Sequence, residues 1–298
     1  MGGQRKKIKE NDFSNNKDPQ KHTKVIMIVY KNVLAVLLLL AINIGCASSQ
    51  QIAMLKSGVE NWNKWRVENS KVIPTLRKAD LDSANLRRAD LRGANLRYAH
   101  LEGAHLEGAL LEGAVLWDAN LEGVHLDSAN LLGADLRGAD LERADLREAN
   151  LDSADLREAN LERADLDSAN LRKTNLLVAN LSRIFLEGAH LEGATLGGAF
   201  LWDAHLAGAH LAGVHLWQAT LYGADLDNAD LRDADLRGAH LDSVNLNKVI
   251  SLYKAKIDPS ILSKIKTNWP EKLATFWDDT KENWAIDHTL LEKIKKPD

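Results

Sequence analysis

The sequence predicts a solenoid, a fold in which one short unit is stacked on itself many times. From Ala79 to Lys248 the phrase Ala-(Asp/Asn)-Leu-x-x recurs thirty-four times without an insertion or deletion. The Leu is present in all thirty-four copies, and the residue two before it is Ala in twenty-nine. The other five copies have a small or β-branched residue there, namely Val124, Thr174, Ile184, Val214 and Val244. A unit this short cannot bury an apolar face alone, so its copies have to stack into one core.

This phrase closely resembles the repeat of the pentapeptide-repeat family, and the resemblance covers residues 79–248, which is 170 of the 298 residues. It implies an all-β fold, a right-handed quadrilateral β-helix with one pentapeptide per side and four per coil. Residues twenty apart would then stack on one face, with the Leu and the small residue two before it pointing inward. Large and small inward side chains can interlock tightly. Each buried Leu contributes roughly 1.5–3 kcal/mol, so the Leu ladder would be the main source of stability.

The segment before the repeats, residues 50–78, is predicted to be an N-terminal capping helix that leads into the first repeat. The ends of a solenoid expose unpaired backbone and invite end-to-end association, so a homodimer formed in this way is possible unless the ends are covered. Pro74-Thr-Leu76 begins an incomplete first repeat. Before it, apolar residues at spacings of three and four indicate an amphipathic helix: Ile52, Leu55, Val59 and Trp62.

The segment after the repeats, residues 249–298, is predicted to be a helical cap for the other end. The repeat register ends at Val249-Ile-Ser-Leu252. Asp258 and Pro259 then begin a helix, with Asp as the cap and Pro at the first helical position. Pro270 opens a second helix, which would carry Leu273, Phe276 and Trp277. The sequence therefore predicts an α-helical cap at each end of the β-helix.

Residues 1–49 are predicted to be a basic leader followed by a hydrophobic signal or anchor segment. Within the apolar stretch of residues 25–47, the strongest part is the ten residues 33–42, which is shorter than the ~20 residues of a bilayer span. Cys46, the only cysteine, follows it in a context that resembles a bacterial lipoprotein signal, although Asn43 stands where such signals carry Leu. The resemblance implies lipidation of Cys46. It also leaves either Met1 or Met27 as the start.

An uncleaved transmembrane helix over residues 25–47 is the alternative, with the basic leader held in the cytoplasm. Both alternatives place the repeat domain outside the cytoplasmic membrane, anchored in the bacterial cell envelope by a lipid or by one hydrophobic helix. A soluble cytoplasmic protein is the third. A lone cysteine excludes a disulfide framework, so stability has to come from the repeat.

The repeats are far more acidic than the flanks. The whole chain has a formal net charge of −4, whereas residues 79–248 contain 15 Lys and Arg against 29 Asp and Glu, a net charge of −14. Part of this acidity is structural, because Asp or Asn before each Leu can accept a hydrogen bond from nearby backbone. In the implied fold one column is acidic: Glu102, Glu122, Glu142 and Glu162. Another column is basic and aromatic: Arg97, Arg137, Arg157 and Arg237 with Trp117 and Trp217.

Histidine is the one residue type that suggests chemistry, and eight of the ten His stand directly before a central Leu. In the implied fold His105 would stack with His125, and His190 with His210, which makes a metal shared by two imidazoles possible. His205, His210 and His215 would lie on successive sides, however, so no full ligand set is expected. No catalytic grouping or phosphate-binding loop is recognised in the sequence. We therefore predict no enzymatic activity, no metal and no cofactor.

Exposed aromatic residues are the candidate partner-binding groups, because aromatic side chains on an otherwise polar surface are typical interface anchors. They are Trp117, Phe200, Trp202, Trp217 and Tyr222. The alternative is that the capping segments fold back over them.

These features predict a non-enzymatic, membrane-anchored scaffold that presents its solenoid surface to a protein partner and does not bind nucleic acid directly. The alternative is a cytoplasmic DNA mimic that binds DNA gyrase or another topoisomerase, as the resemblance to gyrase-protecting members of the family implies. The export-type leader argues against that alternative. A third is a carbohydrate- or metal-binding surface made by the aromatic and His columns.

Overall fold

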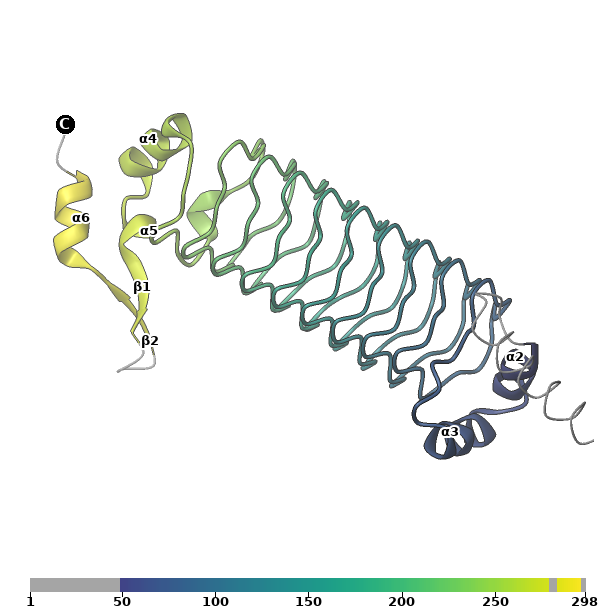
Figure 1. The fold of residues 1–298 in the computed structure, drawn as a ribbon. Helices are drawn as coiled ribbons and strands as arrows, with labels where there is room; N and C mark the ends of the chain where they lie inside the picture. The colour runs from purple at the N-terminus through teal and green to yellow at the C-terminus, as the bar shows by residue number, and fades with distance from the viewer. Residues whose placement is uncertain (1–48, 279–282, 296–298) are drawn as a thin grey trace, which may run out of the picture. The chain divides into compact units, whose positions relative to one another are not determined.

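The computed structural model describes residues 49–278 and 283–295. Two helices, α2 (Ser49–Lys56) and α3 (Val59–Glu68), precede the repeat coils, and a short 3-10 helix η1 (Leu246–Lys248) follows them. The chain then forms α4 (Pro259–Asn268), α5 (Glu271–Ala274), the strands β1 (Thr275–Asp278) and β2 (Asn283–Ile286), and α6 (His288–Lys295). Figure 1 draws these elements in chain order, with the repeat coils as a regular stack.

The coils have four sides each. Parallel bridges join the residue before each central Leu to the residue twenty positions later, from the pair Thr75 and Asn95 through to the pair Thr220 and His240. Twenty residues are four pentapeptides, so the predicted vertical columns exist, and residues twenty apart lie one above the other (Figure 1).

Every backbone N–H of a pentapeptide donates a hydrogen bond, and this requirement explains why the residue before the Leu is Asp or Asn. In one copy the N–H groups of Leu121 and Gly123 donate to the next coil at 2.6 and 2.8 Å, and that of Asn120 donates to the previous coil at 2.9 Å. The N–H of Ala119 closes a β-turn at 3.0 Å. The fifth, that of Glu122, donates to Oδ1 of Asn120 at 3.0 Å. The Asp or Asn before Leu is therefore part of the backbone hydrogen bonding, as predicted.

The core is the predicted ladder of Leu and small residues. Every central Leu from Leu81 to Leu236 is at most 2% exposed, and the Ala two before each is buried along almost the whole column. Thr174, which replaces Ala in one copy, is fully buried and donates from Oγ1 to the carbonyl of Leu151 at 2.9 Å. A buried hydroxyl is tolerated here because it has a partner.

The N-terminal flank forms two helices instead of the single helix expected from Gln50 to Asn69. The break lies at Gly58, which has a φ of 136° and so ends the helical path between α2 and α3. The predicted apolar face is nevertheless the one that packs inward, since Leu55 is 1% exposed and Trp62 is fully buried against the core. The spacing of the apolar residues indicates the buried face of the two helices but does not reveal the break at Gly58.

Side chains of α2 and α3 bind backbone groups of the first coil. Nε1 of Trp62 donates to the carbonyl of Asp90 at 2.8 Å. Asn63 makes two such bonds, donating from Nδ2 to the carbonyl of Arg88 at 3.0 Å and accepting at Oδ1 from the N–H of Asp90 at 2.8 Å. Gln51 accepts the N–H of Thr75 at 2.9 Å. Edge groups that have no previous coil to pair with are satisfied in this way.

The coils continue past Lys248, where the sequence analysis ended the repeat register. After η1 the bridges resume with a shift of twenty-one residues, joining Asp230 to Ser251 and Asp235 to Lys256. Val249 and Leu252 are fully buried. One extra residue hid this continuation, because an unbroken period of five cannot follow an insertion.

The C-terminal flank differs in part from the all-helical expectation. The helix predicted at Pro259 is present as α4 and follows Asp258. The helix predicted from Pro270, by contrast, is the single turn α5, and Phe276 and Trp277 lie in β1. Strand β1 pairs antiparallel with β2. Aromatic and β-branched residues such as Thr275 favour extended backbone, and this preference prevails over the expected helix here.

The predictions for residues 1–48 lie outside the described residues, including the leader, the apolar stretch of residues 25–47 and the lipidation candidate Cys46. Among the helices that the structure describes, none combines the length and the hydropathy that a bilayer crossing requires.

Candidate interaction surface

One side of the β-helix carries both the acidic column and three of the predicted aromatic anchors. The residues directly after the central Leu on this side stack at the twenty-residue period. We call the residues Glu102, Glu122, Glu142 and Glu162 the acidic column, and Phe200, Trp202 and Tyr222 the aromatic patch. The two lie in line, because Ser182, Trp202 and Tyr222 continue the column that Glu102 to Glu162 begin.

The acidic column is partly neutralised by arginines of the adjoining column. Arg143 contacts Oε1 of Glu122 at 3.0 Å and Oε1 of Glu142 at 2.9 Å. Arg163 and Arg183 each lie 4.0 Å from Oε1 of Glu162. Three of the four glutamates of the acidic column therefore lie within ion-pair distance of an arginine.

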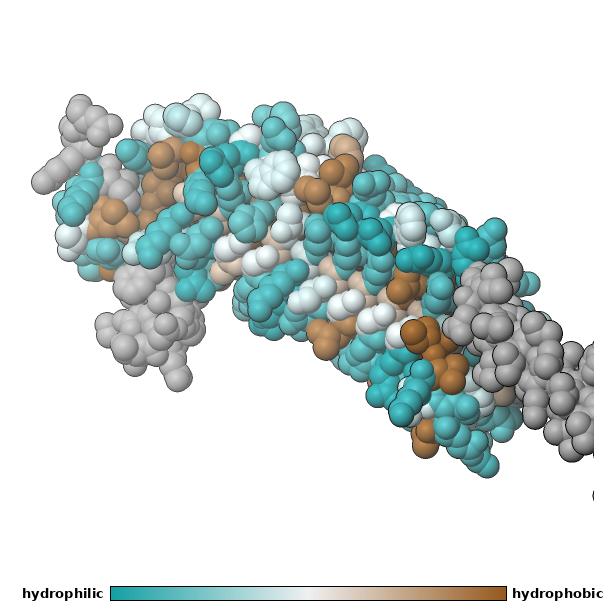
Figure 2. Space-filling view, viewed as in Figure 1, coloured by the Kyte–Doolittle hydropathy of each residue, from teal (hydrophilic) through white to brown (hydrophobic). Residues whose placement is uncertain are grey.

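The aromatic patch is the most exposed part of the predicted aromatic set. Trp202 and Tyr222 are each 54% exposed, and Phe200 is 45% exposed, while the intervening Leu201 is fully buried in the core. Side chains of this size bury a large area when a partner covers them. On the face drawn in Figure 2, hydrophilic residues dominate and the hydrophobic ones form separate spots.

Trp117 and Trp217 lie on the adjoining side and make contacts within the chain. Trp117 is enclosed by Arg97 and Arg137, whose guanidinium carbons lie 5.3 and 5.4 Å from its ring centroid. Trp217 packs over Gly197, in the space that a Cβ at Gly197 would need. Both Trp are about one-third exposed, at 36% and 37%. The predicted column is therefore present, but the cation–π contacts in it indicate a packing role for Trp117.

Many of the carboxylates along the coils are held by arginines of the same repeat. In the sequence Asp-Leu-Arg, the guanidinium reaches back to its own Asp, as Arg237 does to Asp235 with bonds of 2.8 and 2.6 Å. The hydrogen bonds from Arg237, acting against burial, lower the pKa of Asp235 to about 2. Arg137 lowers the pKa of Asp135 by the same contact. These ion pairs fix side chains along the sides of the coils.

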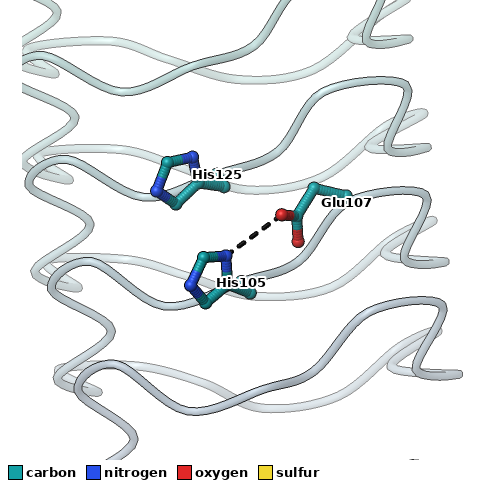
Figure 3. Close-up of side chains that lie close together, drawn as sticks. All are labelled: His105, Glu107 and His125. Atoms are coloured by element: carbon teal, nitrogen blue, oxygen red, sulfur yellow. Dashed lines mark hydrogen bonds and ion pairs between the residues drawn. The ribbon is translucent and has the colours of Figure 1, made fainter.

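Two groups of His and Glu converge, which the sequence analysis did not expect. The predicted stacks exist, with ring centroids 4.6 Å apart for His105 and His125 and 4.4 Å apart for His190 and His210. The structure adds one glutamate to each stack. Ligand atoms of His105, Glu107 and His125 all lie within 4.8 Å of one another (Figure 3), and those of the second group do so as well: His190, Glu192 and His210.

The His positions alone do not reveal the glutamate, because it lies in the turn that follows the first His of each stack. The residue two after the lower His turns back toward it across the β-turn, so Nδ1 of His105 lies 3.0 Å from Oε1 of Glu107 (Figure 3). The pattern that could have found both groups is His-Leu-Glu with a second His twenty residues after the first. His205 has a different neighbour, stacking on Phe185 at 4.8 Å.

Comparison with known proteins gives a family and several similar structures. The profile of the family "Pentapeptide repeats" matches residues 75–113, 104–143, 144–183, 186–216, 201–238 and 209–247. Among proteins with curated descriptions, none matches the sequence.

Three solved structures illustrate the likeness. HetL from the cyanobacterium Nostoc sp. strain PCC 7120, a pentapeptide repeat protein involved in heterocyst differentiation regulation, is 36% identical over 59% of this chain and 84% of its own, with a TM-score of 0.34. Rfr23 from the cyanobacterium Cyanothece 51142 is 40% identical over 32% of this chain and 60% of its own, with a TM-score of 0.27. Trypsin-treated QnrB1, a plasmid-mediated fluoroquinolone resistance protein, is 22% identical over 63% of this chain and 94% of its own, with a TM-score of 0.43.

The family matches extend over more than half of the chain and coincide with the stacked coils. The fold of this family implies that the β-helix is right-handed. The chain belongs to the pentapeptide-repeat family.

Proposed function

We propose that this protein is a membrane-anchored scaffold of the bacterial cell envelope that binds a protein partner through its aromatic patch. Pentapeptide-repeat proteins are generally non-enzymatic structural and interaction proteins, and a non-enzymatic, scaffold-like character fits this chain. The observation that carries the proposal is the exposure of Phe200, Trp202 and Tyr222 on one side of an otherwise polar solenoid.

The aromatic patch supports protein binding for two reasons. The β-helix backbone beneath it is fixed by hydrogen bonds on both edges of each coil, so little conformational entropy is lost when a partner binds. The patch is also bordered by Asp203, which is 58% exposed and lies 3.9 Å from Arg183. An aromatic centre with a charged rim is typical of interfaces in which a few residues carry most of the binding energy.

A partner-capture experiment tests this surface. Trp202→Ala and Tyr222→Ala remove anchors without touching the core, so each should lower recovery of the bound partner about tenfold or more when the full-length protein is isolated from its own cells. Leu132→Ala is the matched control, since Leu132 is an exposed apolar residue (44%) on another side. Equal recovery with all three variants would contradict the proposal.

The membrane anchor rests on the sequence of residues 25–47 and on Cys46. For a lipoprotein, the protein should fractionate with membranes, globomycin should block its processing, and Cys46→Ser should abolish lipid attachment. For an uncleaved anchor, the membrane association should survive both treatments. A full-length protein found only in the soluble fraction would contradict both forms of the anchor.

The DNA-mimic alternative draws its support from the acidic column. A duplex mimic has to present unneutralised charge at regular spacing, whereas Arg143, Arg163 and Arg183 lie within ion-pair distance of Glu122, Glu142 and Glu162. This pairing favours the scaffold. A soluble protein that alters supercoiling by DNA gyrase would favour the mimic instead.

We further propose that both flanks act as caps. The support at one end is the set of bonds from Trp62, Asn63 and Gln51 to the first coil. At the other end, Asp258 accepts the N–H of Gly238 at 3.0 Å through Oδ2. Because the flanks form hydrogen bonds with backbone groups at both ends of the β-helix, the protein should be monomeric. An end-to-end homodimer would be detected as a doubled mass by light scattering.

A further inference from the structure

The two His–Glu–His clusters are copies of one arrangement. In each, an Arg precedes the first His by eighteen residues, the Glu follows that His by two, and the second His follows by twenty. The first cluster is Arg87, His105, Glu107 and His125, and the second is Arg172, His190, Glu192 and His210. The column continues in the same way at both places, with Asn below the first His and Asp above the second. The same arrangement at two places on different sides of the solenoid indicates a specific local geometry.

The donor atoms suit a transition-metal ion. Two imidazoles and one carboxylate are the ligand set of many zinc sites, with the fourth position left open. In zinc sites the ligand atoms stand about 3.3 Å apart, because each lies ~2.0–2.2 Å from the metal. In both clusters the ligand atoms already lie within 4.8 Å of one another. Nδ1 of the first His and Oε1 of the Glu are 3.0 Å apart in the first cluster and 3.3 Å apart in the second.

Each glutamate has an atom without a partner. Oε2 of Glu107 and Oε2 of Glu192 are buried and make no hydrogen bond, although Oε1 of each accepts from Arg and contacts His. A buried carboxylate oxygen left in this state costs free energy that a bound cation would recover. The unpaired oxygen therefore adds to the His stacking at both places, although Oε2 of Glu112, outside both clusters, is also unpaired.

A side-chain cation already occupies the same position in each cluster. Nη2 of Arg87 lies 2.9 Å from Nδ1 of His105 and 2.7 Å from Oε1 of Glu107. Nη2 of Arg172 does the same in the second cluster, at 2.8 and 3.0 Å. Both Arg are more than 40% exposed, so each can turn away into solvent. Two of the three donors of each cluster are therefore arranged around a positive charge, and the Arg competes with a metal ion for them.

We propose that each His–Glu–His cluster binds one Zn²⁺ ion, which displaces the Arg and joins two successive coils. The stacked rings are within 12° of parallel and have to tilt toward each other to aim their lone pairs at one ion. That motion is available, because the outer torsion of His is broad and both lower rings are 35% exposed. Figure 3 shows Glu107 lying beside both rings of the first stack.

Zinc titration calorimetry of the full-length protein tests the proposal. The wild type should bind two Zn²⁺ per chain, His125→Asn and His210→Asn one each, and the double variant none. Asn is the substitute because it occupies the same repeat position at Asn120 and Asn150, so the coils should remain intact. His215→Asn is the matched control and should retain both sites, since His215 bridges to Thr195 and Asp235 and belongs to neither cluster.

Replacing the competing arginine tests the two clusters specifically, because the affinity of zinc bound elsewhere on the surface would not change. Arg87→Gln should tighten binding at the first cluster about three- to tenfold, and Arg172→Gln at the second, because each removes a surface ion pair and a like charge. Bound zinc should also raise the melting temperature of the wild type and leave that of the double His variant unchanged. An unchanged stoichiometry in the double His variant, or a zinc affinity indifferent to both Arg substitutions, would overturn the proposal.

Discussion

At the scale of the residue, the last position of each repeat is governed by the backbone. Its φ is positive in nearly every copy, a conformation that Gly adopts freely and that costs other residues about 1–2 kcal/mol. Gly fills many copies, such as Gly113 (φ 62°), but Val178 has a φ of 60° with a β-branched side chain. The structure offers no reason for a Val at this position.

Val178→Gly should therefore stabilise the protein by about 1 kcal/mol, because it removes backbone strain at an exposed residue. Gly113→Ala should destabilise it by a similar amount, since a Cβ at Gly113 would meet nothing within 4 Å and only the backbone cost remains. Chemical denaturation of the two variants measures both effects. Shifts of the same sign would contradict the turn assignment.

Asp235→Asn probes the ion pair within a single repeat. The amide can still accept the N–H of Arg237, as Oδ1 of Asp235 does now at 3.3 Å, but it loses the charge. Because the pKa of Asp235 is lower in the folded protein, its ion pair stabilises the native state at pH values above the ordinary pKa near 3.8. This stabilisation is lost as the pH falls through the folded pKa of about 2. Because Arg237 is 62% exposed, the pair is screened by solvent and should contribute at most about 1 kcal/mol at pH 7. Unfolding curves should show this difference at pH 7 and none below pH 2, and a constant difference would refute the linkage.

At the scale of the element, the helical flanks were predictable in kind and less so in detail. Apolar spacing identified the buried face of α2 and α3, while the break at Gly58 depends on a single backbone angle. The resumption of the coils after the one-residue insertion before Leu252 and the pairing of β1 with β2 depend on contacts between segments. Neither the repeat period nor the conformational preference of single residues predicts such contacts.

Asn63→Ala should show what covering the first coil contributes. It removes two hydrogen bonds to edge backbone and leaves the carbonyl of Arg88 and the N–H of Asp90 unpaired, at a cost of about 1–3 kcal/mol. Exposed edge groups should also increase self-association, which sedimentation measures. Asn61→Ala, an exposed position in the same helix, is the control. If both variants behave as the wild type does, α3 is not a cap.

At the scale of the whole molecule, the repeat period determined the fold class and the vertical columns, and the stacking of His105 on His125 followed from it. The period could not indicate which surface residues pair with one another. Trp117 stays a predicted partner-binding residue, and the arginines above and below it also pack against its ring. Glu107 was not considered, although it completes a donor set. In the first case side chains of one column stack on each other, and in the second the carboxylate reaches back from the turn.

Every surface assigned here depends on residues twenty apart lying one above the other, and oxidation of paired cysteines tests that directly. In a Cys46→Ser background, Glu142→Cys with Glu162→Cys places two thiols on adjacent coils about 4.8 Å apart at Cα, within the range of a disulfide. Glu142→Cys with Arg157→Cys places them on different sides. We expect rapid loss of free thiols in the first pair and none in the second. Efficient cross-linking of the fifteen-residue pair, without that of the twenty-residue pair, would contradict the four-sided coil.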